Sequence, residues 1–103
     1  MKQSAPVFAA LGDPTRLRLV SRLARGEPLT ISQLTEGERV TRQAISKHLE
    51  VLSSAGLVSD RKQGRERFYA LDAGPIDDAR AYLEQVSTQW DRAIARLKAL
   101  VES

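Results

Sequence analysis

The stretch VTRQAISKHLEVLSSAGLV at residues 40–58 predicts one short amphipathic helix, over about residues 41–55, that ends at a glycine and runs into a strand. Thr41 can cap the first turn with its hydroxyl, and Gly56 can adopt the left-handed conformation that ends many helices. Apolar residues recur at intervals of three and four, which predicts an inward stripe of Ala44, Ile45, Leu49, Leu52 and Ala55. The outer face then carries Arg42, Gln43, Ser46, Lys47 and Glu50. A polar and cationic outer face of this kind is typical of a helix that reads DNA.

Three further helices are predicted before this one, at about residues 5–11, 14–25 and 31–36. Asp13 followed by Pro14 is a typical helix start, and Thr30 with Gln33 has the pattern of a capping box. In the second helix the predicted inward residues are Leu17, Val20, Leu23 and Ala24, and the predicted outward residues are Arg16, Arg18, Arg22 and Arg25. Residues 37–40 are then the tight turn of a helix-turn-helix.

A β-hairpin, or wing, is predicted over about residues 57–72, because two runs of strand-forming residues flank a reversal at Gly64. Its tip is basic and carries Arg61, Lys62, Arg65 and Arg67. Charges at such a position can discourage edge-to-edge aggregation, or they can contact phosphates. The neighbouring helix favours phosphate contact.

The chain from about residue 76 to residue 101 predicts one long helix with an apolar stripe along its whole length. The stripe could pack within the monomer, but the other helices are too short to cover it. We expect the same helix of a second subunit to cover it and so to form a homodimer. The expected dimer interface comprises Phe8, Leu83, Val86, Trp90, Ile94 and Leu97.

Composition indicates a single domain spanning residues 1–103, of the mainly α (α+β) class, with four helices, a hairpin and a long last helix. The absence of cysteine excludes disulfides and thiolate metal sites, and no apolar run is long enough to span a membrane. We therefore expect a cytoplasmic protein. An enzyme is not expected, because the sequence has one histidine, no cysteine nucleophile and no phosphate-binding glycine loop.

The positive charge is concentrated in the middle of the chain. Residues 39–69 carry seven Lys or Arg against three Asp or Glu, whereas residues 70–103 carry four against six. Because the basic excess coincides with the predicted helix-turn-helix and hairpin, it favours double-stranded DNA as the partner. A winged-helix module that docks an acidic protein partner is the alternative.

Three motifs in this order resemble the ArsR (arsenic-repressor-like) family of transcriptional regulators. They are ALGDPTRLRL at residues 10–19, AISKHLEVL with AGLV at residues 44–52 and 55–58, and GRERFYAL at residues 64–71. The resemblance implies a winged helix-turn-helix homodimer that binds an inverted-repeat operator, acts as a repressor and is released by an effector. The last helix, with Trp90 and the ending ALVE, is similar to that of a cysteine-free subgroup.

The resemblance also implies a set of DNA-binding residues, which agrees with the chemistry of the side chains. Gln43 and Lys47 can reach base edges in the major groove, whereas hydroxyl and guanidinium groups suit phosphates. The candidate DNA-binding residues are Thr41, Arg42, Gln43, Ser46, Lys47, His48, Arg61, Arg65 and Arg67. For His48, packing as a neutral ring against the preceding helix is an equal alternative.

This sequence matches the family less well at the residues by which many members bind regulatory metals. The third helix lacks Cys and His, and the acidic residues of the last helix are spread over more than three turns. We therefore expect no metal site of the usual type and no cofactor. An unidentified small-molecule effector would be expected between Phe8 and the last helix around Tyr82, Val86 and Trp90. Glu38 and Arg39 stand in a turn where the family more often has an apolar residue and a glycine.

Overall fold

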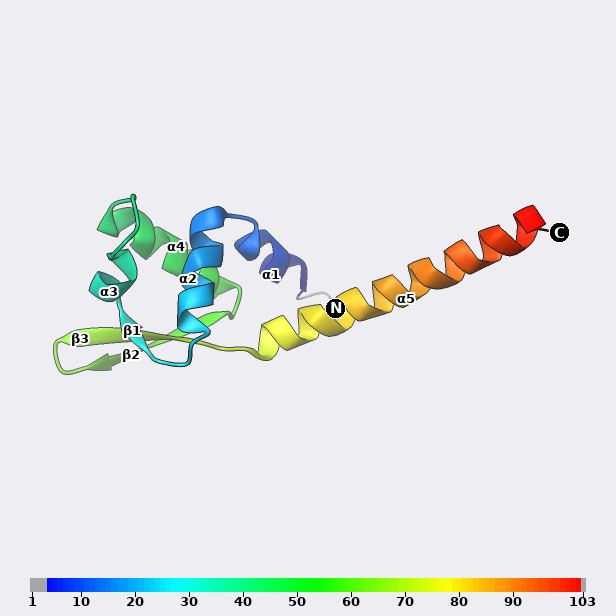
Figure 1. Ribbon diagram of the computed structural model, residues 1–103. Coiled ribbons are helices and arrows are strands. Elements are labelled where there is room, and N and C mark those ends of the chain that lie inside the picture. Colours follow the sequence, from blue (N-terminus) through cyan, green and yellow to red (C-terminus); the bar gives the residue numbers. More distant parts are fainter. Residues whose placement is uncertain (1–3, 103) are drawn as a thin grey trace.

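The computed structural model describes residues 4–102 and confirms the predicted succession of four helices, a hairpin and a long last helix. The helices are α1 (Ser4–Leu11), α2 (Pro14–Leu23), α3 (Ile31–Thr35), α4 (Arg42–Ser54) and α5 (Gly74–Glu102). The strands are β1 (Leu29–Thr30), β2 (Val58–Gln63) and β3 (Glu66–Leu71). Figure 1 shows that all elements except most of α5 form one head, from which α5 projects.

Local capping starts three of the helices as predicted. The Asp13 carboxylate accepts a hydrogen bond from the Arg16 amide, and Pro14 occupies the first turn of α2. Thr30 and Gln33 form a reciprocal capping box at the start of α3. These contacts span three residues, so the sequence pattern alone was enough to predict them.

The core lies between α1, α2, α3, α4 and the start of β2. Its largest fully buried side chains are Val7, Leu19, Leu23, Leu34, Ile45, Leu49, Leu52 and Leu57. The inward stripe predicted for α4 is confirmed at Ile45, Leu49 and Leu52, which are buried, whereas Ala44 and Ala55 are only half-buried. Their burial leaves the polar side of the same helix facing outward.

The face predicted for α2 is partly wrong. Leu17 is 48% exposed and Ala24 is also exposed, whereas Thr15, Leu19 and Leu23 form the buried row. Arg16 and Arg22 were predicted to point outward, but both are half-buried because their guanidinium groups donate to backbone carbonyls of α1 and α3. Long arginine side chains can lie along a protein surface when carbonyl acceptors are within reach.

The hairpin belongs to a three-stranded antiparallel sheet with the strand order β1-β3-β2. Strand β1 was not predicted. It pairs Leu29 with Tyr69 and Thr30 with Phe68. Two residues are too few to show the alternation of apolar and polar side chains by which a strand is recognised in a sequence. Strand β1 forms because the folded chain places these residues beside β3.

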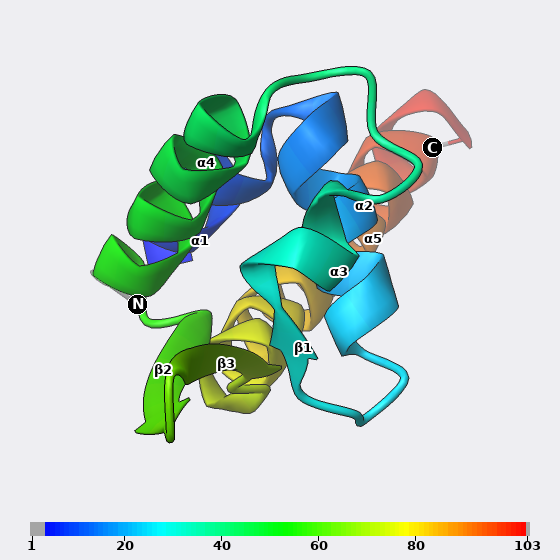
Figure 2. The same ribbon diagram turned by 90° about the vertical axis from the view of Figure 1, so that its left-hand side faces the viewer.

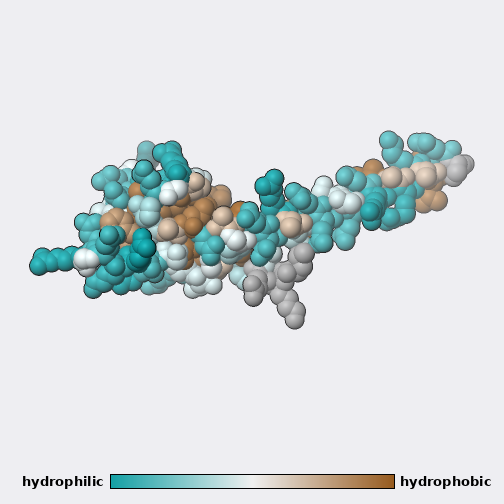
Figure 3. All heavy atoms as spheres, turned by 90° about the horizontal axis from the view of Figure 1, so that it is seen from below, coloured by the Kyte–Doolittle hydropathy of each residue, from teal (hydrophilic) through white to brown (hydrophobic). Residues whose placement is uncertain are grey.

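Helix α5 is packed against the head at its beginning and projects beyond it. Ala79 is buried, and the Phe8 and Tyr82 rings lie with their centroids 6.3 Å apart between α1 and α5. Further along, Trp90 is 65% exposed. The head and α5 together measure 69 × 25 × 22 Å. Apolar side chains recur along the projecting part to its end (Figure 3).

Candidate nucleic-acid interface

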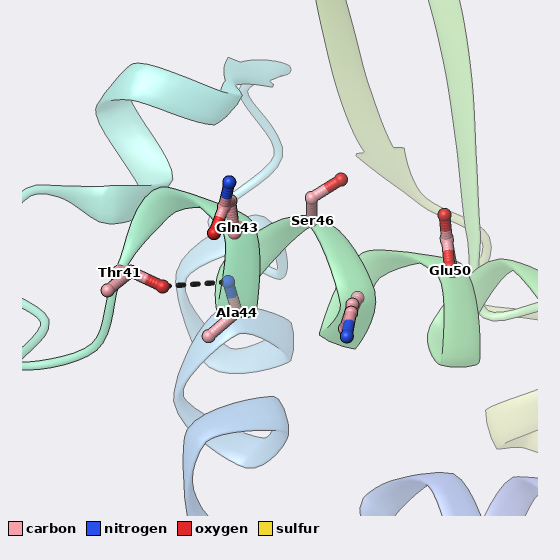
Figure 4. A pocket seen from close by; sticks show the side chains of 6 residues that line it. Thr41, Gln43, Ala44, Ser46 and Glu50 are labelled. Carbon is pink, nitrogen blue, oxygen red and sulfur yellow. Dashed lines mark hydrogen bonds between the residues drawn. The ribbon is translucent and has the colours of Figure 1, made fainter.

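The first turn of α4 presents the side chains predicted to read DNA. Thr41 is the N-cap residue, and its hydroxyl oxygen accepts a hydrogen bond from the Ala44 amide at 3.1 Å (Figure 4). The Thr41 hydroxyl proton is not used by this bond and can be donated to a phosphate oxygen. Arg42 and Gln43 follow at once, and both are exposed.

A shallow depression runs along the outer side of α4. It is lined by Thr41, Gln43, Ala44, Ser46, Lys47 and Glu50. Figure 4 shows Gln43, Ser46 and Glu50 on the same side of the helix, as their spacing of three and four residues requires. Arg42 stands in the first turn of α4 and Lys47 in the second, whereas the negative Glu50 lies about one turn beyond Lys47. Contact with a polyanion is therefore favoured at the beginning of α4.

His48 lies on a different side of α4, against the start of α2. Its Nδ1 is 3.2 Å from Nη1 of Arg16. The same Nδ1 is 3.9 Å from Oδ2 of Asp13, so the ring lies between a guanidinium group and a carboxylate, and its role as donor or acceptor depends on its tautomer. This is the arrangement of the packed alternative, and it separates His48 from the surface that carries Gln43 and Lys47.

Arg16 connects this histidine to the end of α1 and to the N-cap of α2. Its Nε donates to the carbonyl oxygen of Ala10 at 2.5 Å, at the end of α1. The hydrogen bond from its amide to Asp13 lowers the pKa of that carboxyl group; desolvation opposes this effect, and the nearby side chains of His48 and Arg16 lower the pKa further.

The lowered pKa of Asp13 predicts a pH dependence of stability. Because the folded-state pKa is below the unfolded value, the stabilisation is fully present well above the ordinary aspartate pKa of 3.8 and is lost as the pH falls through the lower folded-state pKa. The melting temperatures of wild type and Asp13→Ala should differ by a constant amount from pH 5 to pH 7 and converge toward pH 2. Thr41→Ala, which removes an uncharged cap, is the matched control and should lower the melting temperature equally at every pH. An Asp13→Ala effect of the same size at pH 3 and pH 7 would contradict the assignment.

The wing brings some of its predicted basic residues together and separates others. Gly64, with a φ of 66°, and Arg65 form its two-residue turn, so Arg65 stands at the exposed tip. The strand register pairs Lys62 with Arg67 and Arg61 with Phe68. Because side chains alternate between the two faces of a strand, Arg61 lies on the opposite face from Lys62 and Arg67.

Asp60 is a charged residue of this site that the sequence analysis did not single out. Its carboxylate forms an ion pair with Arg67 across the hairpin. Asp60, Arg67 and Tyr69 line a polar cleft between the wing and α4, whose other side includes Ser46 and Glu50. The positive charge of Arg67 is thus partly neutralised, whereas Arg65 extends beyond the cleft. Counting back from the Gly64 turn would have placed Asp60 and Arg67 on one face of the hairpin.

Residues 4–102 also bear on the possibility of a metal site and of a membrane-spanning helix. This part of the chain holds no group of three or more His, Cys, Asp or Glu side chains placed to bind a metal ion. None of its helices combines the length and the apolar character needed to cross a membrane.

Comparison with known proteins agrees with this geometry. A family described as a helix-turn-helix domain matches residues 11–61, from the end of α1 to β2. The HTH-type transcriptional regulator Rv2034 of Mycobacterium tuberculosis is 40% identical over 93% of this chain and 86% of its own length. An ArsR-like transcriptional regulator from Rhodococcus sp. RHA1 superposes with a TM-score of 0.84 at 37% identity, covering 96% of this chain and 92% of the other.

The chain belongs to the ArsR family. As a member of that family it is a DNA-binding transcriptional regulator and not an enzyme. A solution structure from Mycobacterium bovis is described as the homodimeric winged helix-turn-helix DNA-binding domain of "a possible ArsR-family transcriptional regulator". It matches at 28% identity with a TM-score of 0.64, over 87% of this chain and 80% of the other.

Proposed function

We propose that this ArsR-family protein is a repressor that binds an inverted-repeat operator as a homodimer. The observation that carries the proposal is the exposed apolar stripe of α5. Leu83, Trp90, Ile94 and Leu97 are each more than half exposed. Soluble proteins rarely leave a continuous apolar surface of this kind uncovered, and the same helix of a second copy fits it.

Pairing of the α5 helices would hold two heads on one assembly. In related DNA-binding folds, two recognition helices enter successive major grooves about 34 Å apart. Gln43 and Lys47 are then proposed to read base edges, while Thr41, Arg42, Ser46 and Arg65 contact the DNA backbone. Arg61 and Arg67 are proposed as further phosphate contacts from the two faces of the wing. His48 supports the position of α4 through Arg16, and repression follows because the occupied promoter excludes the polymerase.

A small-molecule effector is proposed at the junction of α1 and α5. Phe8 and Tyr82 already contact each other there. A ligand that separated the two rings would change the angle at which α5 leaves the head, and through it the spacing of the two recognition helices. We propose a cytoplasmic location, where the promoter DNA is found.

The test combines the mass of the protein in solution with a footprint on the DNA upstream of its own gene. Light scattering should give twice the chain mass, and DNase should leave a protected palindrome with half-site centres about 10 base pairs apart. The affinity should fall with salt with a log–log slope of about −7 to −9, since each subunit offers four to five phosphate-binding groups. A monomer with no protected palindrome would instead favour the docking of an acidic protein partner.

A further inference from the structure

Two arginines of α2, one helical turn apart, hold the end of α3 and the turn that follows it. Arg22 donates from Nη2 to the carbonyl oxygen of Gln33 at 2.6 Å and from Nη1 to that of Leu34 at 2.9 Å. Arg18 donates from Nε and Nη2 to the carboxylate of Glu38, at distances of 2.9 to 3.3 Å. In Figure 2 the link from α3 to α4 passes close to α2.

The side chain of Glu38 is buried although it is charged, while the residue as a whole is half-buried. Its side chain is 5% exposed, whereas the side chain of its partner Arg18 is 55% exposed. The hydrogen bonds from Arg18 occupy both carboxylate oxygens, and Nη2 of Arg18 also donates to the Thr15 hydroxyl at 3.0 Å. A buried carboxylate needs such a partner, because without it the charge would be left unsolvated. The raised pKa of Arg18, caused first by this hydrogen bond, agrees with a tight pair.

Glu38 stands three residues before Thr41, the N-cap of α4. Gly37, with a φ of 82°, begins the turn, so the backbone bends there and the next side chain is tied to α2. The residues that follow lead directly into Arg42 and Gln43, which begin the proposed DNA-reading surface. The position of this surface relative to α2 therefore depends on the ion pair between Arg18 and Glu38.

A carboxylate this close to the proposed DNA-reading surface lowers the affinity for DNA, because it repels the phosphates. Its burial against Arg18 shows that it is not exposed to bind a ligand of its own. We propose that Glu38 is a positioning residue for DNA recognition: paired with Arg18, it sets the place of the first turn of α4 and thereby the sequence specificity, without contacting DNA. This inference rests on the proposed operator-binding function.

The test measures the specificity ratio, which is the affinity for the duplex protected in the wild-type footprint divided by that for a shuffled duplex of the same length and composition. Both affinities are measured on the same protein sample. A smaller fraction of folded protein lowers both apparent affinities by the same factor and therefore leaves their ratio unchanged. Glu38→Ala is expected to lower the ratio about 10-fold, while the affinity for the shuffled duplex stays equal or rises because a negative charge is lost. Arg18→Ala should lower the ratio by a similar factor.

Two variants complete the design. Glu36→Ala removes the same charge from an exposed position in the same segment and should leave the ratio within twofold of wild type. The charge exchange Arg18→Glu with Glu38→Arg should restore the ratio to within threefold of wild type. A ratio unchanged in both Glu38→Ala and Arg18→Ala, or a folded exchange variant without recovery, would overturn the inference. A wild-type protein that does not prefer the footprinted duplex would overturn the proposed function itself, so the two failures are distinct.

Discussion

Replacement of Trp90 by aspartate is expected to convert the proposed dimer into monomers and to lower operator affinity by at least about 100-fold. Trp90 is the largest side chain of the α5 stripe and is 65% exposed in the single chain. In a dimer it would be an aromatic anchor at the centre of the interface, where residues of this type contribute most to binding. A carboxylate there would have to be buried without a partner.

The loss of DNA binding follows from the loss of the second head. When two heads are joined, binding of the first raises the effective concentration of the second at its half-site. A monomer has only one set of α4 and wing contacts and gains nothing from the other half of the operator. Sedimentation analysis at micromolar concentration should show the change in mass, and gel shifts on the footprinted operator should show the change in affinity.

Gln85→Asp is the matched control, because it adds the same charge to an exposed position of α5 outside the apolar stripe. It should remain dimeric and bind the operator within about threefold of wild type, since surface substitutions away from packed features have small effects. The proposal fails if Trp90→Asp stays dimeric, or if it becomes monomeric and still binds the operator as tightly as wild type.

The second large effect is expected from two substitutions that distinguish contacts to base edges from contacts to phosphates. Lys47→Ala should cost about 1–3 kcal/mol of binding free energy on the operator and much less on shuffled DNA, because Lys47 is proposed to contact a base edge. Arg65→Ala should weaken binding to both duplexes by a similar factor and should make the salt slope less steep by about one per subunit, because Arg65 is proposed to contact phosphate.

The geometry supports this division of roles. Lys47 lies on the outer side of α4, in the shallow depression that also includes Gln43 and Ser46. Arg65 stands at the tip of the wing, beyond the cleft in which Asp60 holds Arg67. Affinities measured on operator and shuffled duplex over a salt series distinguish the two effects. Full operator preference in Lys47→Ala, or a sequence-dependent loss in Arg65→Ala, would show that the roles are assigned wrongly.

Much of the fold could be predicted because its signals are local. The caps at Asp13, Thr30 and Thr41 involve residues three positions apart, and the buried row of α4 follows from a repeat of three and four. The wing could be predicted from a glycine that lies between two runs of strand-forming residues. The long stripe of α5 was also visible in the sequence, and its exposure in the structure is the basis for the proposed dimer.

The roles of the α2 arginines could not be predicted in this way. Arg16 contacts His48, 32 residues away, and Arg18 contacts Glu38, 20 residues away. A sequence pattern treats each arginine as a solvated charge on an outer face, and nothing in its neighbours indicates which carbonyl or carboxylate will come within reach. The same holds for Leu17, which a helical repeat alone placed on the inner face.

The sequence by itself determined the order of the elements, their caps, the polar side of α4 and the amphipathic character of α5, because each depends on residues within one or two turns of one another. Tertiary structure decided the pairing of β1 with β3, the burial of Glu38 and the neutralisation of Arg67 by Asp60. These depend on distances between elements, which are set only when the core packs and brings distant side chains and backbone carbonyls together.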